Sequence, residues 1–376
     1  MTVSARLGAY YFAYFTYAGV VVPYFSLWLA ARGYSAPQMA LVLAMPPVAR
    51  VFAPALWGWL ADRTGWQRGI VAFSAFAVFG GFAALYLVQG VVEVAAVMLI
   101  LSVLAAGSMP LVEAAALSAT RGRAGSYGPV RVWGSVGFIL AVLGAGAWLD
   151  HHRPDTILAI IVALAAIVCI AAFGIPPREP HAASASSERI GAVLARGDVL
   201  AFFGACMCMS VAHGALYAFL SLYLEGVGYS KAMIGALWTL GVVAEIAVFF
   251  YLPQLMRRFS LRALLIASFA CAAVRFAAIG WLADSVAALV AAQLLHAATF
   301  GSFHAASIAA VHRIFSGRLA GRGQALYSSL TYGIGGASGT LIAGWTWVAF
   351  GPSGSFAVSA AFGAAGALLV VWKVRV

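Results

Sequence analysis

Five charged residues lie inside long apolar runs of this sequence. They are Arg50, Glu113, Arg131, Glu245 and Arg275. If these runs cross a bilayer, each charge costs on the order of 2.5–3.5 kcal/mol at the bilayer centre, so it must face the protein interior, water or a partner. Such residues can bind a polar solute or carry a proton. The alternative is a set of helix–helix clamps, which we favour less because a buried ion pair often adds little stability.

The spacing of four of these residues predicts two acid–arginine pairs. Glu113 and Arg131 lie nine residues to either side of the centre of a short polar loop. On antiparallel helices that rise roughly 1.5 Å per residue, both are then about 13 Å from that loop. Glu245 and Arg275 lie fifteen residues to either side of another loop centre, a distance of about 22 Å. We therefore expect Glu113 to pair with Arg131, and Glu245 to pair with Arg275 near the middle of the membrane.

Three histidines add titratable groups to the apolar runs. His296 and His304 are eight residues apart in one run, which places them about 80° apart around an α-helix. His213 lies in another run. A histidine inside a membrane is either a hydrogen-bonded structural group or a group that exchanges protons near physiological pH. The candidate proton carriers are therefore His296, Glu245 and Glu113, and the sequence does not choose among them.

A further group of residues follows the second apolar run, in the pattern Gly58-x-x-x-Asp62-Arg63-x-Gly65-x-x-Arg68. This pattern places one carboxylate and several cations at helix ends on the membrane surface. Such charges can exchange partners with neighbouring helix ends when the helices move. We therefore predict a gating role for this loop, because an ordinary positively charged loop would not need Asp62.

The composition indicates that membrane helices position these residues. Of the 376 residues, 64% are apolar and only 9% are charged, whereas a soluble domain carries about 25% charged residues. The net charge of +11 comes from scattered arginines, which excludes a nucleic-acid-binding protein. The four cysteines lie in apolar runs without metal-ligand spacing. We expect no metal, no cofactor and no nucleic-acid partner, and the lipid bilayer as the surrounding medium.

Twelve apolar runs divide the chain, each close to or above the roughly 20 residues that cross a bilayer. They lie near 6–31, 36–61, 69–89, 93–118, 127–149, 155–175, 199–225, 232–256, 262–282, 285–312, 323–350 and 354–373. With the N-terminus inside, sixteen Lys and Arg residues fall in cytoplasmic segments and only Arg32, Arg153 and Lys231 fall in outer loops. The positive-inside rule therefore predicts that both termini are cytoplasmic.

The two halves of the chain repeat each other. A shift of 195 residues aligns Ser26-Leu27-Trp28-Leu29 with Ser221-Leu222-Tyr223-Leu224 without a gap, and it aligns Arg50 with Glu245. Because six spans separate the copies, both have the same orientation, related by an axis along the membrane normal. The predicted parts are a six-helix bundle at 1–175, a cytoplasmic linker at 176–198 and a second six-helix bundle at 199–376.

These features resemble the major facilitator superfamily of transporters, whose fold is two bundles of six helices, and the motif at 58–68 is similar to that superfamily's signature. Within it, the chain resembles the branch that contains lactose permease, nucleoside–proton symporters and phenylpropionate permeases. The resemblance to phenylpropionate permeases is closest. It rests on Tyr127-Gly128, Val130-Arg131, Trp133-Gly134, Leu240-Gly241-Val242-Val243-Ala244-Glu245, Leu295-His296 and Thr299-Phe300.

The resemblance implies roles for individual residues. It implies a substrate-binding acid–arginine pair at Glu113 and Arg131, and a second substrate-contacting glutamate at Glu245. It also implies an arginine near the proton site at Arg275 and a coupling histidine at His296. With the residues that the charge pattern and the nearby aromatics add, the expected substrate-binding set is Arg50, Glu113, Arg131, Trp133, Glu245 and Arg275.

The sequence departs from the lactose permease pattern in two places. Thr299 stands where that pattern has its proton-carrying glutamate, and Gln293 stands where it has a lysine. The proton route of that pattern therefore does not carry over, and the expected proton-coupling residues are Glu245, His296 and Glu113.

We expect a secondary transporter of the inner membrane, a monomer whose two bundles rock to take up a small organic solute with a proton. Three intramembrane arginines against two glutamates favour an anionic solute, since a guanidinium binds a carboxylate through two hydrogen bonds. The first expectation is an aromatic carboxylate such as a phenylpropionate-like acid. The alternatives are a sugar or nucleoside proton symporter, or a proton-independent facilitator or efflux carrier. An enzyme is not expected, because no nucleophile or metal motif supports one.

Overall fold

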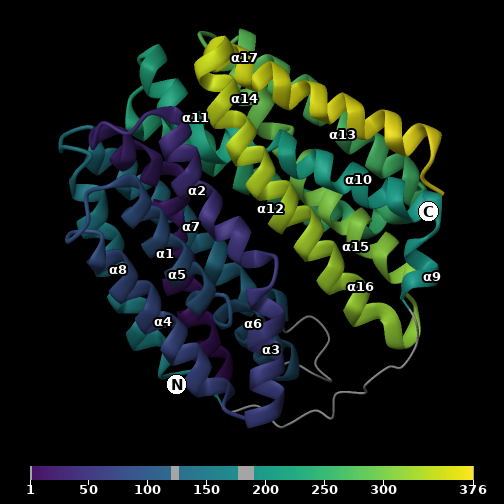
Figure 1. The fold of residues 1–376 in the computed structure, drawn as a ribbon, viewed down its shortest axis with the longest axis horizontal. Helices are drawn as coiled ribbons and strands as arrows, with labels where there is room; N and C mark the ends of the chain where they lie inside the picture. Colours follow the sequence, from purple (N-terminus) through teal and green to yellow (C-terminus); the bar gives the residue numbers. More distant parts are fainter. Residues whose placement is uncertain (1, 120–126, 177–189, 376) are drawn as a thin grey trace. The chain divides into compact units, whose positions relative to one another are not determined.

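The computed structural model describes residues 2–119, 127–176 and 190–375, and every element in this part of the chain is a helix (Figure 1). The expected all-α class is therefore confirmed. The chain divides into two compact units. The first consists of Met1–Ser35, Phe52–Ala183 and Ser230–Ala236, and the second of Ala36–Val51, Ser184–Tyr229 and Leu237–Val376. Most of the predicted linker at 176–198 lies outside the described residues.

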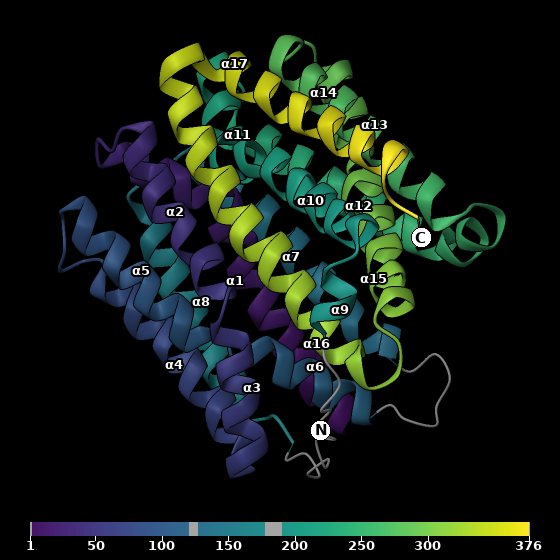
Figure 2. The same cartoon turned by 45° about the vertical axis from the view of Figure 1, so that its right-hand side comes forward.

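The first unit is a bundle in which long helices lie side by side. Its helices are α1 (Val3–Ala31), α3 (Ala53–Thr64), α4 (Gln67–Ala84), α5 (Val91–Ala105), α6 (Ser108–Ala119), α7 (Tyr127–Leu149) and α8 (Thr156–Ala172). Helix α1 packs along α7 and α8, while α4 packs against α5 and α8 (Figure 2). Tyr10, Tyr11 and Val112 are fully buried in the core that these helices form.

Glycines allow α1 and α7 to approach each other closely. A Cβ atom on Gly137 would lie 2.5 Å from the carbonyl oxygen of Phe12, and one on Gly19 would lie 2.7 Å from the carbonyl oxygen of Phe138. No ordinary side chain fits in such a gap, and small residues serve this purpose where membrane helices cross. The close approach brings the aromatic face of α1 next to Arg131 on α7.

The second unit holds the remaining elements. They are α2 (Ala36–Arg50), α9 (Gly191–Leu194), α10 (Gly197–Ala212), α11 (Gly214–Val227), most of α12 (Lys231–Arg258), α13 (Leu261–Trp281), α14 (Val286–Leu294), η1 (Ala297–Ser302), α15 (Phe303–Ile314), η2 (Gly317–Leu319), α16 (Ala320–Tyr327), η3 (Ser328–Gly335) and α17 (Gly336–Trp372). Helix α17 packs against α2, α10, α11 and α13. Figure 2 shows it running past α10 and α13. Both η1 and η3 are π-helical turns, which are rare and frequently occur at functional sites.

The first turn of α12 belongs to the first unit. The Asp150 carboxylate accepts hydrogen bonds from the backbone N–H groups of Lys231 at 2.6 Å and Ala232 at 3.1 Å. Beside it, the Tyr24 hydroxyl donates to the carbonyl oxygen of Val142 at 2.9 Å. A carboxylate at this place satisfies N–H groups that the helix leaves free and complements the helix dipole. Helix α2 is the opposite case. It comes from the first half of the sequence but belongs to the second unit, where it packs against α17 and η3.

Prolines and a glycine shape the helices on either side of the loop motif. Pro46 and Pro47 lie inside α2, and Pro54 lies in the first turn of α3, where the missing N–H group costs least. Helix α3 ends at Gly65, whose φ of 67° is in the left-handed region and whose N–H donates to the carbonyl of Ala61 at 2.9 Å. Other residues are strained at this φ, which explains the glycine of the motif.

Ten helical stretches of the described residues are long and apolar enough to cross a membrane, and Thr156–Ala172 is a shorter apolar helix. One of the ten, Ala320–Trp372, has 53 residues and is broken at Gly351, whose φ is 73°. An unbroken helix of that length would measure about 80 Å, well beyond the roughly 30 Å hydrocarbon core. The count of twelve spans stays a prediction.

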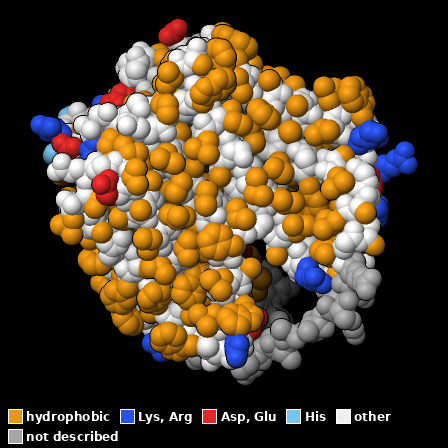
Figure 3. Space-filling view, in the orientation of Figure 1, with side chains coloured by type: hydrophobic (Ala, Val, Ile, Leu, Met, Phe, Trp, Pro, Cys, Tyr) orange, Lys and Arg blue, Asp and Glu red, His pale blue; other side chains and the backbone are white. Residues whose placement is uncertain are grey.

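The outer surface is suited to lipid. Hydrophobic side chains cover the face shown in Figure 3, and the charged side chains lie toward its margins. Large apolar side chains such as Phe250 and Ile170 are exposed on the helices. Because soluble monomers rarely expose apolar surface so widely, this surface supports a multi-pass membrane protein.

Candidate functional site

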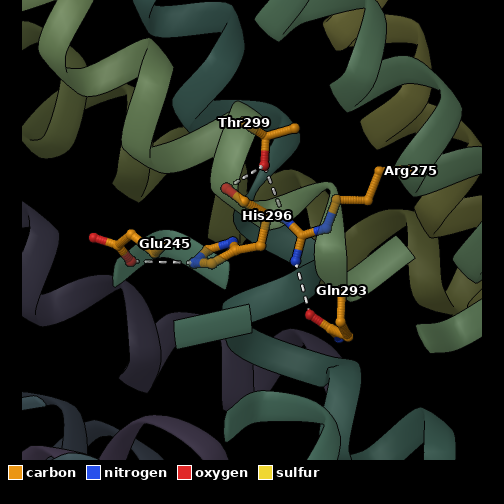
Figure 4. A network of polar contacts seen from close by, with 5 residues as sticks. All are labelled: Glu245, Arg275, Gln293, His296 and Thr299. Carbon is orange, nitrogen blue, oxygen red and sulfur yellow. Dashed lines mark hydrogen bonds and ion pairs between the residues drawn. The ribbon is translucent and has the colours of Figure 1, made fainter. Parts of the chain in front are cut away.

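The second unit contains a network of polar side chains around Arg275 (Figure 4). The Arg275 side chain, on α13, is 1% exposed. Its Nη1 donates to the hydroxyl of Thr299 on η1 at 3.0 Å, and its Nη2 donates to Oε1 of Gln293 on α14 at 3.1 Å. Among the described residues it makes no ion pair, so neutral oxygens hold this buried cation.

Both of these acceptors stand where the sequence departs from the lactose permease pattern. A glutamate at the position of Thr299 would give Arg275 a counter-ion, and a lysine at the position of Gln293 would repel it. The two neutral residues instead accept one hydrogen bond each from the guanidinium. Thr299 and Gln293, the two residues that differ from the lactose permease pattern, thus both bind the same guanidinium. The charge of Arg275 is not neutralised by a direct ion-pair partner among the described residues.

Glu245 lies beside His296 and not in the predicted ion pair with Arg275. Oε2 of Glu245, on α12, is 3.8 Å from Nε2 of His296, and the two side chains are 20% and 10% exposed. The pairing predicted from depth is wrong because the guanidinium of Arg275 is engaged by Thr299 and Gln293. The structure thus brings together two of the three candidate proton carriers.

Four buried polar atoms around this network have no hydrogen-bond partner among the described residues. They are Nε of Arg275, Nε2 of Gln293, Nδ1 of His296 and Nε2 of His213. The His213 ring is held through Nδ1, which lies 2.8 Å from the carbonyl of Met209, and its centroid is 6.5 Å from that of His296. Buried polar groups are normally satisfied, so these atoms are available to water or a solute, and the two imidazole nitrogens are also available to a proton.

Arg50 belongs to the same part of the second unit. It and Glu245 both act electrostatically on the hydroxyl groups of Tyr217 and Tyr332. The Tyr217 ring stacks on Trp238, with 6.1 Å between centroids. The repeat-equivalent residues Arg50 and Glu245 therefore lie around a shared set of tyrosines.

The first unit holds a second group of candidate residues, around Arg131 on α7. The guanidinium carbon of Arg131 lies 4.4 Å from the ring centre of Phe15 and 5.4 Å from that of Tyr11, both on α1. The carboxylate of Glu113 accepts a hydrogen bond from the Tyr127 hydroxyl at 2.8 Å. In the described part of the chain Arg131 and Glu113 make no ion pair, so the direct pairing predicted from their spacing is not formed.

Trp133 lies apart from the Arg131 guanidinium. Its ring meets the edge of Phe12 at 6.4 Å between centroids, it covers Gly8, and it is 52% exposed. Residues two apart on a helix do not face the same way, which explains the separation. A substrate-binding role for Trp133 remains a prediction.

The loop motif lies at the end of α3. Gly58 and Asp62 are one turn apart on that helix, and Gly65 ends it. The space next to Gly58 is open, since a Cβ atom there would meet nothing within 4 Å. Asp62 is exposed and makes no ion pair among the described residues.

The arginines of the motif rest on apolar neighbours and backbone. The guanidinium of Arg63 lies over the ring of Trp59 at 5.4 Å, and Nη2 of Arg68 donates to the carbonyl of Phe173 at 2.7 Å. Arg68 thereby ties the start of α4 to the end of α8. The gating role of the motif stays a prediction.

A model of the MFS_1 like family matches residues 4–358. The chain belongs to this family. The family and the relatives that follow are transporters and not enzymes, so this MFS_1-like protein is a membrane transporter.

Two curated relatives cover most of the transporter. It is 31% identical over 348 residues to a probable 3-phenylpropionic acid transporter of Escherichia coli K12, covering 90% of this chain and 89% of the relative. It is 25% identical over 341 residues to a maltose permease of Geobacillus stearothermophilus, covering 89% and 86%. The resemblance to the superfamily branch stated from the motifs is confirmed.

Solved structures show the same fold. The nucleoside transporter NupG matches with a TM-score of 0.84 at 16% identity, covering 99% of this chain and 98% of that structure. A D-xylose-proton symporter matches with a TM-score of 0.73 at 16% identity, covering 99% and 97%. Identities this low establish the fold alone.

Sequence reasoning missed several participants of the site. Gln293 and Thr299 were not assigned to it, although Gln293 is a polar residue inside an apolar run, which is a signal of its own. The contact between Glu245 and His296 depends on how each helix is rotated about its own axis. The depth of a residue along a helix gives no information about that rotation.

Proposed function

We propose that this transporter carries a small aromatic carboxylate into the cell together with a proton, by alternating access of its two halves. In this proposal the chain acts as a monomer in the inner membrane, with both termini in the cytoplasm. The direction, the solute and the proton go beyond what membership of the family establishes.

The surroundings of the Arg131 side chain support an aromatic carboxylate as the solute. Its guanidinium lies on the faces of Phe15 and Tyr11 and has no ion pair among the described residues. A guanidinium fork matches a carboxylate through two parallel hydrogen bonds, and aromatic rings next to it suit an aromatic solute. A free carboxylate carried on a phenyl ring would satisfy both features at once.

Proton coupling is supported by the contact between Glu245 and His296. A carboxylate and an imidazole 3.8 Å apart interact electrostatically, and both are largely buried, so a proton on one of them affects the other. Arg275 adds a positive charge that is held by neutral oxygens. When Glu245 takes up a proton, this part of the unit gains one positive charge, which favours entry of an anion. An anion and a proton then move as a neutral pair, so no uncompensated charge crosses the membrane.

The relatives agree in part with this proposal. The curated relative that is 31% identical is named a probable 3-phenylpropionic acid transporter, whereas others are named for maltose or nucleosides. The sugar and nucleoside alternatives have in their favour two acidic residues, Glu113 and Glu245, which can accept hydrogen bonds from hydroxyl groups.

The test is uptake of labelled 3-phenylpropionate into liposomes that contain the purified protein. We expect accumulation faster than in protein-free liposomes when the outside is more acidic than the lumen, and loss of this difference when a protonophore removes the gradient. The amide 3-phenylpropionamide is a matched control, because it keeps the ring and chain but lacks the carboxylate. It should not compete with 3-phenylpropionate for the transporter.

The alternatives give different outcomes in the same assay. Uptake of maltose or uridine in preference to 3-phenylpropionate would replace the aromatic acid by a sugar or nucleoside. Equal equilibration of 3-phenylpropionate with and without the gradient would replace symport by a facilitator. Competition by the amide as strong as that by the acid would remove the role of the carboxylate.

A further inference from the structure

Three rings form a column along the tenth predicted span. The His296 and Phe300 rings stack with 5.4 Å between centroids and 18° between planes, and the Phe300 and His304 rings stack with 6.2 Å and 11°. An α-helix would turn His304 about 80° away from His296. The π-helical turn Ala297–Ser302 between them takes more residues per turn, which brings the two imidazoles into one column.

The far end of this column connects to two tyrosines. Nδ1 of His304 is 2.8 Å from the hydroxyl oxygen of Tyr332, which lies on η3. That hydroxyl is in turn 3.2 Å from the hydroxyl oxygen of Tyr327 on α16. Tyr327 is 1% exposed, so the chain of hydrogen bonds ends inside the protein.

The column begins at the contact between Glu245 and His296. His296 and His304 are eight residues apart, which corresponds to about 12 Å along the helix. By the predicted topology, this direction leads from the middle of the membrane toward the cytoplasmic end of the span. The titratable and charged groups around the column come from several elements of the second unit: Arg50 on α2, Cys206 on α10, His213 between α10 and α11, Glu245 on α12, Arg275 on α13, Tyr327 on α16 and Tyr332 on η3.

We propose that His304 is a second proton-binding group of this transporter, which receives the proton after Glu245 and His296 and is stabilised in its charged form by the Tyr332–Tyr327 pair. This proposal rests on the proposed proton coupling. It adds a residue that neither the motifs nor the resemblance assigned.

The tyrosine pair can serve both states of His304. When the imidazole is neutral at Nδ1, the Tyr332 hydroxyl donates to that nitrogen. When His304 is protonated, Nδ1–H donates to the Tyr332 oxygen, and the Tyr332 hydroxyl turns to donate to Tyr327. Hydrogen bonds from a charged donor are roughly twice as strong as neutral ones, so the pair favours the charged form.

The transfer itself moves one proton and breaks no other bond. Glu245 or His296 releases the proton, and His304 binds it on its imidazole. Phe300 has no exchangeable proton, so the proton passes its ring on water. His304 then releases the same proton toward the cytoplasmic end of the span, and the hydroxyls of Tyr332 and Tyr327 return to their first orientation.

The first experiment follows His304 without any solute. Full-length protein with ¹⁵N-labelled histidine, in lipid nanodiscs, is titrated by NMR, and the His304 signal is identified by its absence in His304→Gln. We expect this signal to change from the neutral to the protonated form as the pH is lowered. Tyr332→Phe should move this change to lower pH, because the charged imidazole loses its hydrogen-bond acceptor. Tyr223→Phe is the matched control, because that hydroxyl bonds to Gly280 and Ser353 instead.

The second experiment measures transport of 3-phenylpropionate in liposomes. His304→Gln should slow accumulation driven by a proton gradient and leave exchange of solute across the membrane close to wild type. Tyr332→Phe should shift the pH dependence of accumulation in the direction of the NMR shift.

The two experiments separate the two proposals. A His304 signal that does not titrate, or that Tyr332→Phe and Tyr223→Phe move equally, overturns the role of His304. Unchanged proton-driven accumulation in His304→Gln also overturns it. A His304 signal that titrates and responds to Tyr332→Phe, in a protein that accumulates no 3-phenylpropionate, supports the proton site and counts against the proposed solute.

Discussion

The guanidinium of Arg275 donates from Nη1 to the hydroxyl of Thr299 across the interface between α13 and η1. Neither partner is exposed by more than 1%. The Thr299 hydroxyl therefore occupies the place of a counter-ion beside a buried cation. The contribution of this hydrogen bond to the stability of the protein can be measured.

Thr299→Val is expected to destabilise the protein. Valine has nearly the shape of threonine but accepts no hydrogen bond, so one nitrogen of a buried charged group loses its partner. Such a loss costs about 1–3 kcal/mol. The melting temperature of the purified protein should fall, while Thr299→Ser, which keeps the hydroxyl, should melt near wild type. Equal melting of the valine variant and wild type would mean that this hydrogen bond contributes nothing.

Arg131→Lys is expected to reduce uptake of 3-phenylpropionate sharply while the protein still inserts into the membrane. Lysine keeps the charge but loses the planar fork that binds a carboxylate through two bonds. Arg153→Lys is the matched control, because Arg153 is exposed and pairs with Asp155 at the surface. Wild-type uptake by Arg131→Lys would leave Arg131 as a structural residue that rests on Phe15 and Tyr11.

Glu245→Gln is expected to abolish accumulation against a gradient and to leave downhill exchange measurable. The amide cannot bind and release a proton in the transport cycle, whereas it can still contact solute. His296→Gln should have a milder effect, and Glu93→Gln, at the exposed start of α5, should have none. Should His296→Gln lose accumulation while Glu245→Gln keeps it, the histidine is the main proton carrier.

The predicted topology is tested by labelling from outside the cell. In a variant without the four native cysteines, a cysteine introduced by Ser186→Cys should not react with a membrane-impermeant maleimide in intact cells. One introduced by Arg153→Cys should react, because that residue is predicted to lie in an outer loop. The reverse pattern of labelling would invert the orientation of the whole chain.

Gly137→Ala is expected to destabilise the first unit. The added Cβ would lie 2.5 Å from the Phe12 carbonyl oxygen, so α1 and α7 must move apart. Gly144→Ala, on the same helix, meets nothing within 4 Å and should leave the melting temperature unchanged or slightly higher, since alanine favours helix by roughly 1 kcal/mol over glycine. If the two variants melt alike, the close approach of these helices is not needed for stability.

Much of the fold was predictable because few structures are open to such a sequence. Only 9% of all residues are charged, and the long apolar runs between them must form membrane helices. The ionisable site residues could also be identified from the sequence, because a charge inside a membrane costs free energy. Glu245 and Arg275 therefore indicate a functional role where they occur in apolar runs.

The contacts of the site were less predictable. Counting residues places Glu245 and Arg275 at similar depths, but it does not say which way each side chain points around its helix. Glu245 meets His296 instead. The column of His296 and His304 was missed for a related reason, since a count of 3.6 residues per turn does not foresee the π-helical turn between them.

The exchange of segments between the compact units has a consequence for how the halves of this chain recognise each other. A chain cut between its halves would leave the first fragment with α2, whose packing partners α17 and η3 lie in the second fragment. The second fragment would keep the start of α12, whose N–H groups bond to Asp150 in the first. Each fragment thus carries a piece whose packing partners lie in the other fragment. A chimera with half of a relative would therefore have to match both pieces together.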